Sequence, residues 1–145
     1  MTEIKILDDL NSPYIKKIND IILKWINIET IDNIKNGIIN NTYPITIILL
    51  KDNKLIGFYQ IVEHDNDNTS YTPWIANVYV LEEYRGLGYG GVLIESIPDF
   101  MKELNIKTIY LHTRQINLYE KFGFEKYQEL VLGDNIKRFI YKMDI

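Results

Sequence analysis

The stretch EEYRGLGYGG, residues 82–91, places four glycines and an arginine within ten residues of the chain. It follows the apolar run WIANVYV (residues 74–80) and precedes a helical pattern that begins at Val92. Glycine costs conformational entropy on folding, so this clustering indicates that the backbone must stay free of side chains. Unblocked N–H groups at the start of a helix, with the positive end of its dipole, are typical of a site for a pyrophosphate.

The loop also fits the pattern of a dinucleotide site, because its glycines satisfy G-x-G-x-x-G between a strand and a helix. That fold needs an acidic residue at the end of the next strand, but this strand ends in LHTR (residues 111–114). No further strand–helix–strand units follow His112. A P-loop needs Gly-Lys-Ser/Thr, which the sequence lacks. A dinucleotide-dependent oxidoreductase is therefore the weaker alternative, beside a tight turn with incidental glycines.

The composition is that of one globular domain covering residues 1–145. A net charge of −4 argues against broad nucleic-acid binding, which usually requires a basic surface. The absence of cysteine excludes disulfides and a thiolate nucleophile. The first ten residues are too polar for a signal peptide, and no apolar run approaches membrane-spanning length. We expect a cytoplasmic protein that binds neither nucleic acid nor membrane.

A polar loop is expected at residues 63–73, where Asp65 and Asp67 have the spacing of a calcium-binding loop. The required glycine is replaced by Ser70 and the final glutamate by Ala76. We therefore expect no metal site.

The apolar periodicity predicts the element order β-α-α-β-β-β-α-β-α-β-β. Ser12 and Pro13 have the positions of an N-cap and a first helical residue, and Pro98 should kink or break the helix that follows the glycines. Asn77 is unusual within a strand, and either a β-bulge or an edge position would explain it. Strands are expected at residues 2–7, 46–50, 55–62, 74–80, 108–112, 125–132 and 137–143. Helices are expected near residues 13–27, 31–38, 92–104 and 116–124.

Two segments resemble one known family. Residues 85–90, Arg-Gly-Leu-Gly-Tyr-Gly, resemble the R/Q-x-x-G-x-G/A signature of the GNAT superfamily of N-acetyltransferases. LYEKFGF (residues 118–124) resembles the second recurrent segment of that family, and the element order matches along essentially the whole chain. The resemblance implies an α/β (α+β) fold, with a mixed, mostly antiparallel sheet of about seven strands, helices on both faces and a splayed central strand.

The resemblance also implies acetyl-CoA as cosubstrate and assigns residues to it. Asn117 matches a position that often contacts the cofactor, and Tyr119 matches the tyrosine that protonates the leaving thiolate. The strand positions that would pair with the pantetheine arm are Val78, Tyr79 and Val80. The positions whose backbone N–H groups would hold the pyrophosphate are Arg85, Gly86, Leu87, Gly88, Tyr89, Gly90 and Gly91.

Acetyl transfer to an amine needs an oxyanion donor, a proton for the sulfur and a base. A strand N–H near Val78 could polarise the thioester carbonyl, and a tyrosine hydroxyl is protonated at neutral pH. The strand at 74–80 lacks the carboxylate that some members of the family use as base. We predict Glu63 as the base, with His64, His112 or a water chain as alternatives. Trp74 and Tyr71 are predicted to line the acceptor pocket.

The predicted activity is N-acetyl transfer from acetyl-CoA to a primary amine, on a small molecule or a peptide. Direct transfer is favoured because no cysteine is available to carry the acetyl group. The alternative from another class is a non-catalytic acyl-CoA-binding sensor or interaction module, because a fold does not fix a function. A homodimer is compatible with either prediction.

Overall fold

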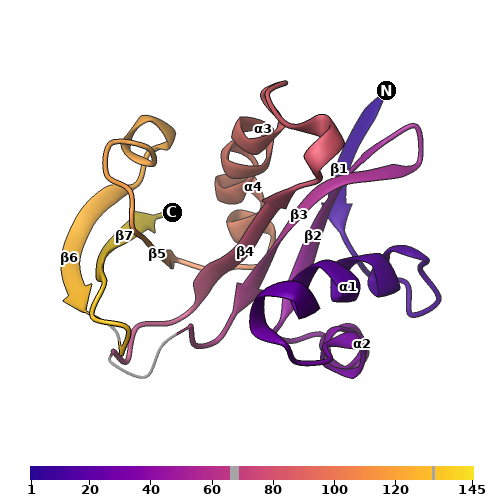
Figure 1. Cartoon of the computed structure of the whole chain (residues 1–145), viewed down its shortest axis with the longest axis horizontal. Coiled ribbons are helices and arrows are strands. Elements are labelled where there is room, and N and C mark those ends of the chain that lie inside the picture. Colours follow the sequence, from indigo (N-terminus) through magenta and orange to yellow (C-terminus); the bar gives the residue numbers. More distant parts are fainter. Residues whose placement is uncertain (66–68, 132) are drawn as a thin grey trace.

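The structure is a computed structural model that describes residues 1–65, 69–131 and 133–145. Within these residues it has a seven-stranded sheet in the order β1-β2-β3-β4-β5-β7-β6, antiparallel except for β4 and β5 (Figure 1). The strands are β1 (Thr2–Ile6), β2 (Ile45–Lys51), β3 (Lys54–Val62), β4 (Trp74–Val80), β5 (Thr108–Thr113), β6 (Glu125–Val131) and β7 (Lys137–Asp144). The helices are α1 (Tyr14–Ile26), α2 (Ile31–Asn40), α3 (Tyr89–Glu95) and α4 (Ile97–Glu103). Asp67, within the predicted 63–73 loop, and Leu132, at the end of a predicted strand, lie outside the described residues.

Helices α1 and α2 cover one face of the sheet. Helix α1 begins at Tyr14 with Pro13 at the N-cap, one residue later than predicted, and the hydroxyl oxygen of Ser12 accepts a hydrogen bond from the backbone N–H of Tyr14 (3.2 Å). Asn27 ends α1 in the left-handed conformation, with φ of +54°. Between the two helices, Asn19 Oδ1 accepts hydrogen bonds from the backbone N–H (2.7 Å) and hydroxyl (2.9 Å) of Thr30. The apolar residues of α1 and α2 that pack fully on this face are Ile15, Ile18, Ile22 and Ile34.

Helices α3 and α4 pack on the opposite face, which confirms the prediction of helices on both faces (Figure 1). The predicted interruption at Pro98 is also confirmed, because α3 ends at Glu95 and α4 begins at Ile97. Proline has no N–H to donate, so it is tolerated in the first turn of α4 but not inside one continuous helix. Leu93, Ile97 and Met101 are the fully buried residues of these helices.

A β-bulge lies in the middle of β4. The register with β3 shifts between Phe58 and Gln60, so that Asn77 and Val78 both lie opposite Tyr59. Asn77 has φ of +56°, a left-handed conformation that asparagine tolerates better than most residues. The bulge alternative for Asn77 is therefore confirmed. The edge alternative is wrong, because β4 lies between β3 and β5.

The predicted splay of the sheet falls between β4 and β5. Their pairing consists of Trp74 opposite Tyr110, whereas the other neighbouring strands pair over most of their length. In Figure 1 the layer of β5, β7 and β6 accordingly stands apart from the layer of β1 to β4. Among the described residues, no strand pairs with the β5-facing edge of β4 beyond Trp74, so this edge is open to a ligand.

Candidate active site

Two adjoining cavities lie where β4 and β5 diverge, and Val78 and Tyr119 line both of them. The first, called here the glycine-loop cavity, has a volume of about 420 Å³. The second, the inter-strand cavity, has a volume of about 350 Å³. The glycine-loop cavity is also lined by Gly88, Gly90, Gly91, Ile94, Leu118, Lys121 and Phe122. The inter-strand cavity is also lined by Asp65, Ile75, Ala76, Asn77, Leu111 and His112.

The glycine loop exposes bare backbone beside the first cavity. Gly86 and Gly88 have φ of +78° and +87°, a region in which side chains are strained. A Cβ atom built at Gly86, Gly88 or Gly90 would meet no atom of the described residues within 4 Å. In the part of the chain that the structure describes, the N–H groups of residues 86–91 donate to no protein acceptor. The loop therefore has the free amides that the sequence predicted for an anion.

Arg85 differs from this expectation. Its backbone N–H donates to the carbonyl of Glu82 (3.2 Å), so the run of free amides begins one residue later than predicted. Its side chain donates from Nε to the carbonyl of Val80 (2.9 Å), and its guanidinium carbon lies 5.1 Å from the ring centroid of Tyr79. Arg85 thus ties the loop to the end of β4 through its Nε donor and to Glu82 through its backbone N–H.

Lys121 supplies a positive charge that sequence reasoning missed. Its Nζ lies 5.4 Å from the ring centroid of Phe122, and that ring in turn lies 3.8 Å from the position of a Cβ on Gly91. Among the described residues that line the glycine-loop cavity, Lys121 carries the only formal charge. The segment 118–124 had already been singled out, but its lysine had no assigned role.

Tyr119 lies between the two cavities, where the chain turns sharply. Asn117 and Gly123 have φ of +65° and +97°, and one 3₁₀ turn (Glu120–Phe122) replaces the longer helix predicted there. The ring of Tyr119 is half-buried, with its centroid 6.0 Å from that of Tyr141. Burial raises the pKa of the Tyr119 hydroxyl above its ordinary value of about 10. The phenol is therefore protonated at neutral pH and can act as a proton donor.

His112 and Asp65 lie close together in the inter-strand cavity. His112 Nε2 lies 2.7 Å from Asp65 Oδ2, and the side chains are 19% and 29% exposed. The oxygen lies off the direction in which a proton on Nε2 would point, so the contact is an ion pair for a protonated ring and not a directed hydrogen bond. His112 was one of the predicted alternatives for the base. Asp65 was missed, because nothing local relates the 63–73 loop to β5.

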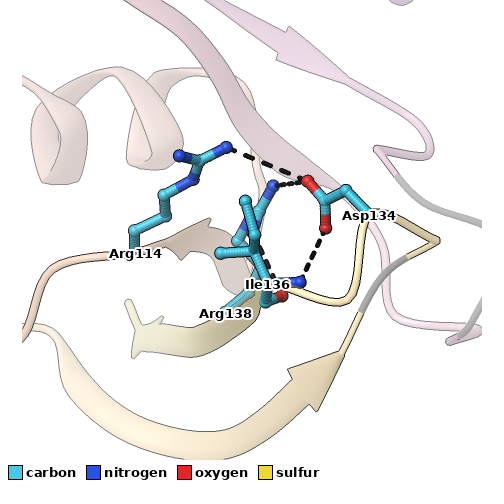
Figure 2. A network of polar contacts seen from close by, with 4 residues as sticks. All are labelled: Arg114, Asp134, Ile136 and Arg138. Carbon is cyan, nitrogen blue, oxygen red and sulfur yellow. Dashed lines mark hydrogen bonds and ion pairs between the residues drawn. The ribbon is translucent and has the colours of Figure 1, made fainter.

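A polar network holds the turn between β6 and β7 beside the end of β5 (Figure 2). Asp134 accepts from the backbone N–H of Ile136 (3.0 Å) and from Arg138 (2.6 Å), and Arg114 lies 3.8 Å away. The hydrogen bond from Ile136 and that from Arg138 lower the pKa of the Asp134 carboxyl below its ordinary range. Because Arg114 follows β5 directly, the network fixes this turn close to the strand that carries His112.

Comparison with known proteins identifies the family. The model of the acetyltransferase (GNAT) family matches residues 8–124, which is most of the chain. The chain belongs to the GNAT acetyltransferase family. The predicted family and fold class are thereby confirmed.

Individual GNAT relatives resemble only part of the chain, at about one third sequence identity. The chain is 32% identical over 82 residues to a [ribosomal protein bS18]-alanine N-acetyltransferase of Haemophilus influenzae, covering 54% of this chain and 53% of that protein. It is 31% identical over 91 residues to the spermine/spermidine N(1)-acetyltransferase of Bacillus subtilis, covering 57% and 60%. The matches thus span little more than half of these relatives. A chain of the NatC complex bound to Gag peptide and CoA shares the fold, with a TM-score of 0.74, 21% identity and coverage of 99% and 98%.

Several GNAT positions predicted to hold the cofactor lie along the cavities. Val78, Gly88, Gly90 and Gly91 are lining residues, as is the predicted acid Tyr119. Asn117 is exposed and lines neither cavity. The other predicted positions outside the lining are Tyr79, Val80, Arg85, Gly86, Leu87 and Tyr89. Contact of any of these residues with a cofactor stays a prediction.

The predicted base Glu63 does not line either cavity. Its side chain is 66% exposed just beyond the end of β3, where its Oε1 lies 3.8 Å from His64 Nε2. Of the residues proposed as base from the sequence, the structure places His112 inside the inter-strand cavity and leaves Glu63 and His64 outside it.

The two aromatic residues predicted for the acceptor pocket, Tyr71 and Trp74, lie side by side with tilted rings whose centroids are 6.5 Å apart. Trp74 is fully buried, and its indole N–H donates to the carbonyl of Tyr71 (2.6 Å). Tyr71 stacks on Tyr110 with ring centroids 4.9 Å apart and donates its hydroxyl hydrogen to Gln128 (2.7 Å). Neither residue lines the two cavities, and contact of either with an acceptor stays a prediction.

Two further properties of the described residues concern metals and membranes. No group of three or more His, Cys, Asp or Glu side chains there is placed to hold a metal ion. No helix in the same residues has the length and apolarity needed to cross a membrane.

Proposed function

We propose that this protein is an N-acetyltransferase that moves the acetyl group of acetyl-CoA directly onto a primary amine. The observation that carries the proposal is that two cavities share the lining residues Val78 and Tyr119 in a chain of the GNAT family. One cavity has free amides for a phosphate group, and the other has an acid–base pair. The relatives named for a protein alanine and for spermine or spermidine support an amine acceptor.

The glycine-loop cavity fits the diphosphate of acetyl-CoA. Free N–H groups from Gly86 onward provide hydrogen-bond donors, and the open space at Gly88 and Gly90 allows a ligand to approach the backbone. Lys121 adds a positive charge at the same cavity. CoA is present in the related NatC structure, which supports the same donor here. When bound, acetyl-CoA supplies the activated thioester.

The β4 bulge acts on the carbonyl oxygen of the thioester, and Tyr119 acts on its sulfur. A new N–C bond forms to the amine, and the C–S bond of the thioester breaks. A backbone N–H of β4 near Val78 donates to the carbonyl oxygen as negative charge develops on it. Tyr119 lies at the junction of the cavities and gives its proton to the departing sulfur. No cysteine is present to carry the acetyl group, so the amine attacks directly.

The amine must lose a proton before or during attack, because a primary alkylamine has a pKa of about 10.4. We assign this proton to His112, whose imidazole lines the inter-strand cavity and can accept a proton there. Asp65, at 2.7 Å, stabilises the imidazolium that results and attracts the incoming ammonium group. Glu63, predicted from the sequence, would have to act from outside the cavity, and a water chain is the third route.

The test is a thiol-release assay with acetyl-CoA and a panel of amines: a peptide that begins with alanine, spermidine, free lysine and an amine-free control. We expect turnover with at least one amine and the acetylated product in its mass spectrum. Binding of acetyl-CoA measured by calorimetry, without turnover on any amine, would contradict the proposal and favour the acyl-CoA-binding sensor.

A further inference from the structure

Two hydrogen bonds, one partly and one fully buried, connect the β4 bulge to β3 and β2. Asn77 Nδ2 donates to Gln60 Oε1 (2.8 Å), and Gln60 Nε2 donates to the Thr46 hydroxyl oxygen (3.1 Å). Gln60 and Thr46 are only 4% and 3% exposed. Each end of the Gln60 amide thus has a partner, so its orientation is fixed from both sides.

These hydrogen bonds are set in an otherwise apolar layer. Ile48 and Phe58, which lie two residues from Thr46 and Gln60 and therefore on the same face of β2 and β3, are fully buried. Replacing hydrogen-bonded partners by apolar groups of the same shape can be nearly neutral for stability. Stability alone therefore does not require polar residues here. The polar residues instead fix an orientation, because a buried amide with two hydrogen-bond partners holds one position.

The fixed Gln60 amide holds the side chain of Asn77, which has a φ of +56° although it lies within a strand. The left-handed conformation is strained for most residues other than glycine, and asparagine adopts it with local hydrogen bonding. Asn77 lines the inter-strand cavity and Val78 lines both cavities, so the backbone between them lies where the acetyl group would react. A change in the Asn77 conformation would turn this peptide group.

We propose that Gln60 is a positioning residue for acetyl transfer: through Asn77 it fixes the β4 backbone against which the thioester carbonyl is held. This inference rests on the proposed function for the identity of the ligand. It assigns no contact between Gln60 and the substrate. The effect of Gln60 acts through Asn77, and the hydroxyl of Thr46 keeps the Gln60 amide in the required orientation.

The experiment compares Gln60→Leu, Asn77→Gly and the double variant by calorimetry with acetyl-CoA and with CoA. Glycine at position 77 still allows a positive φ but removes the side chain that Gln60 holds. Because CoA lacks the acetyl carbonyl, its Kd should stay within about 2-fold of wild type in all three variants. The preference for acetyl-CoA over CoA should fall several-fold in each. The double variant should lose no more than either single variant, because both remove the same contact.

Turnover provides the second measurement. An oxyanion donor that is lost altogether costs about 10²–10³ in kcat, so a misdirected one should cost about 10-fold or more. Thr46→Val leaves the bond between Gln60 and Asn77 intact and serves as a matched control with a smaller loss. Thermal unfolding checks that each variant folds. If Gln60→Leu does not fold, Asn77→Gly tests the same contact from its other end.

A folded Gln60→Leu or Asn77→Gly variant with wild-type kcat and unchanged preference for acetyl-CoA would overturn the proposal. Additive losses in the double variant would overturn it as well, because they would show independent roles. The binding measurement needs no amine. It therefore separates this inference from the proposed function, which fails if wild-type protein binds acetyl-CoA but acetylates no amine.

Discussion

Replacing Gly90 with valine tests whether the glycine loop must stay bare for CoA to bind. Gly90 lies in the first turn of α3 and outside the left-handed region, and a Cβ there meets no atom of the described residues within 4 Å. Valine should therefore fold normally, with a helix propensity about 0.3 kcal/mol more favourable than that of glycine. Gly88→Val is a poorer probe, because its φ of +87° strains a β-branched residue whether or not CoA binds.

The expected loss of affinity follows from the amides that the new side chain would cover. Gly90 lines the glycine-loop cavity, and the N–H groups of residues 86–91 have no acceptor in the described part of the chain. A hydrogen bond to a charged group contributes about 1.5–3 kcal/mol. Losing one of them should raise the Kd for CoA about 10- to 150-fold, and steric exclusion of the diphosphate would raise it further.

The measurement is calorimetric titration with CoA, combined with thermal unfolding of the same samples. Gly133→Val is the matched control, because a Cβ on Gly133 also meets no atom of the described residues within 4 Å, but Gly133 lies in the turn between β6 and β7. We expect the control to bind like wild type. A Gly90→Val variant that unfolds at the wild-type temperature and binds CoA with unchanged Kd would refute the assignment of the loop.

The remaining predictions concern the acid, the base and the charge beside the loop. Tyr119→Phe should lower kcat about 10²–10⁴-fold with little change in the Kd for acetyl-CoA, and rapid-quench kinetics that find an unaltered chemical step would exclude Tyr119 as the acid. Because burial raises the pKa of Tyr119, its loss of the proton should lower the wild-type rate only above a pH of about 10. His112→Gln should lower kcat/KM about 10²–10⁴-fold, whereas Glu63→Gln should change it little; the reverse pattern would restore Glu63 as the base. Lys121→Met should weaken CoA binding and reduce its dependence on salt, while Lys102→Met, an exposed α4 control, should change neither. Equal salt dependence in wild type and Lys121→Met would contradict a role for this lysine at the diphosphate.

The sequence by itself predicted what is encoded between near neighbours in the chain. Pro98 breaks the helix because it lacks an N–H, and its effect needs no distant partner. Gly86 and Gly88 mark the left-handed turn for the same local reason, since any side chain would strain it. The segment 118–124 was located correctly, although the expected helix is a single 3₁₀ turn between Asn117 and Gly123.

Only the tertiary structure decided which side chains contact each other between neighbouring strands and across the gap between β4 and β5. Asp65 reaches His112 from a loop that is distant in the sequence, and Gln60 holds Asn77 because the register of β3 with β4 shifts at that point. The prediction of Glu63 relied on its place after β3 and lacked the geometry that leaves it exposed. Register and strand separation result from the packing of the whole core on both faces of the sheet. Local patterns therefore identified the family loop, whereas the partners of the reacting groups depend on long-range packing that no short segment specifies.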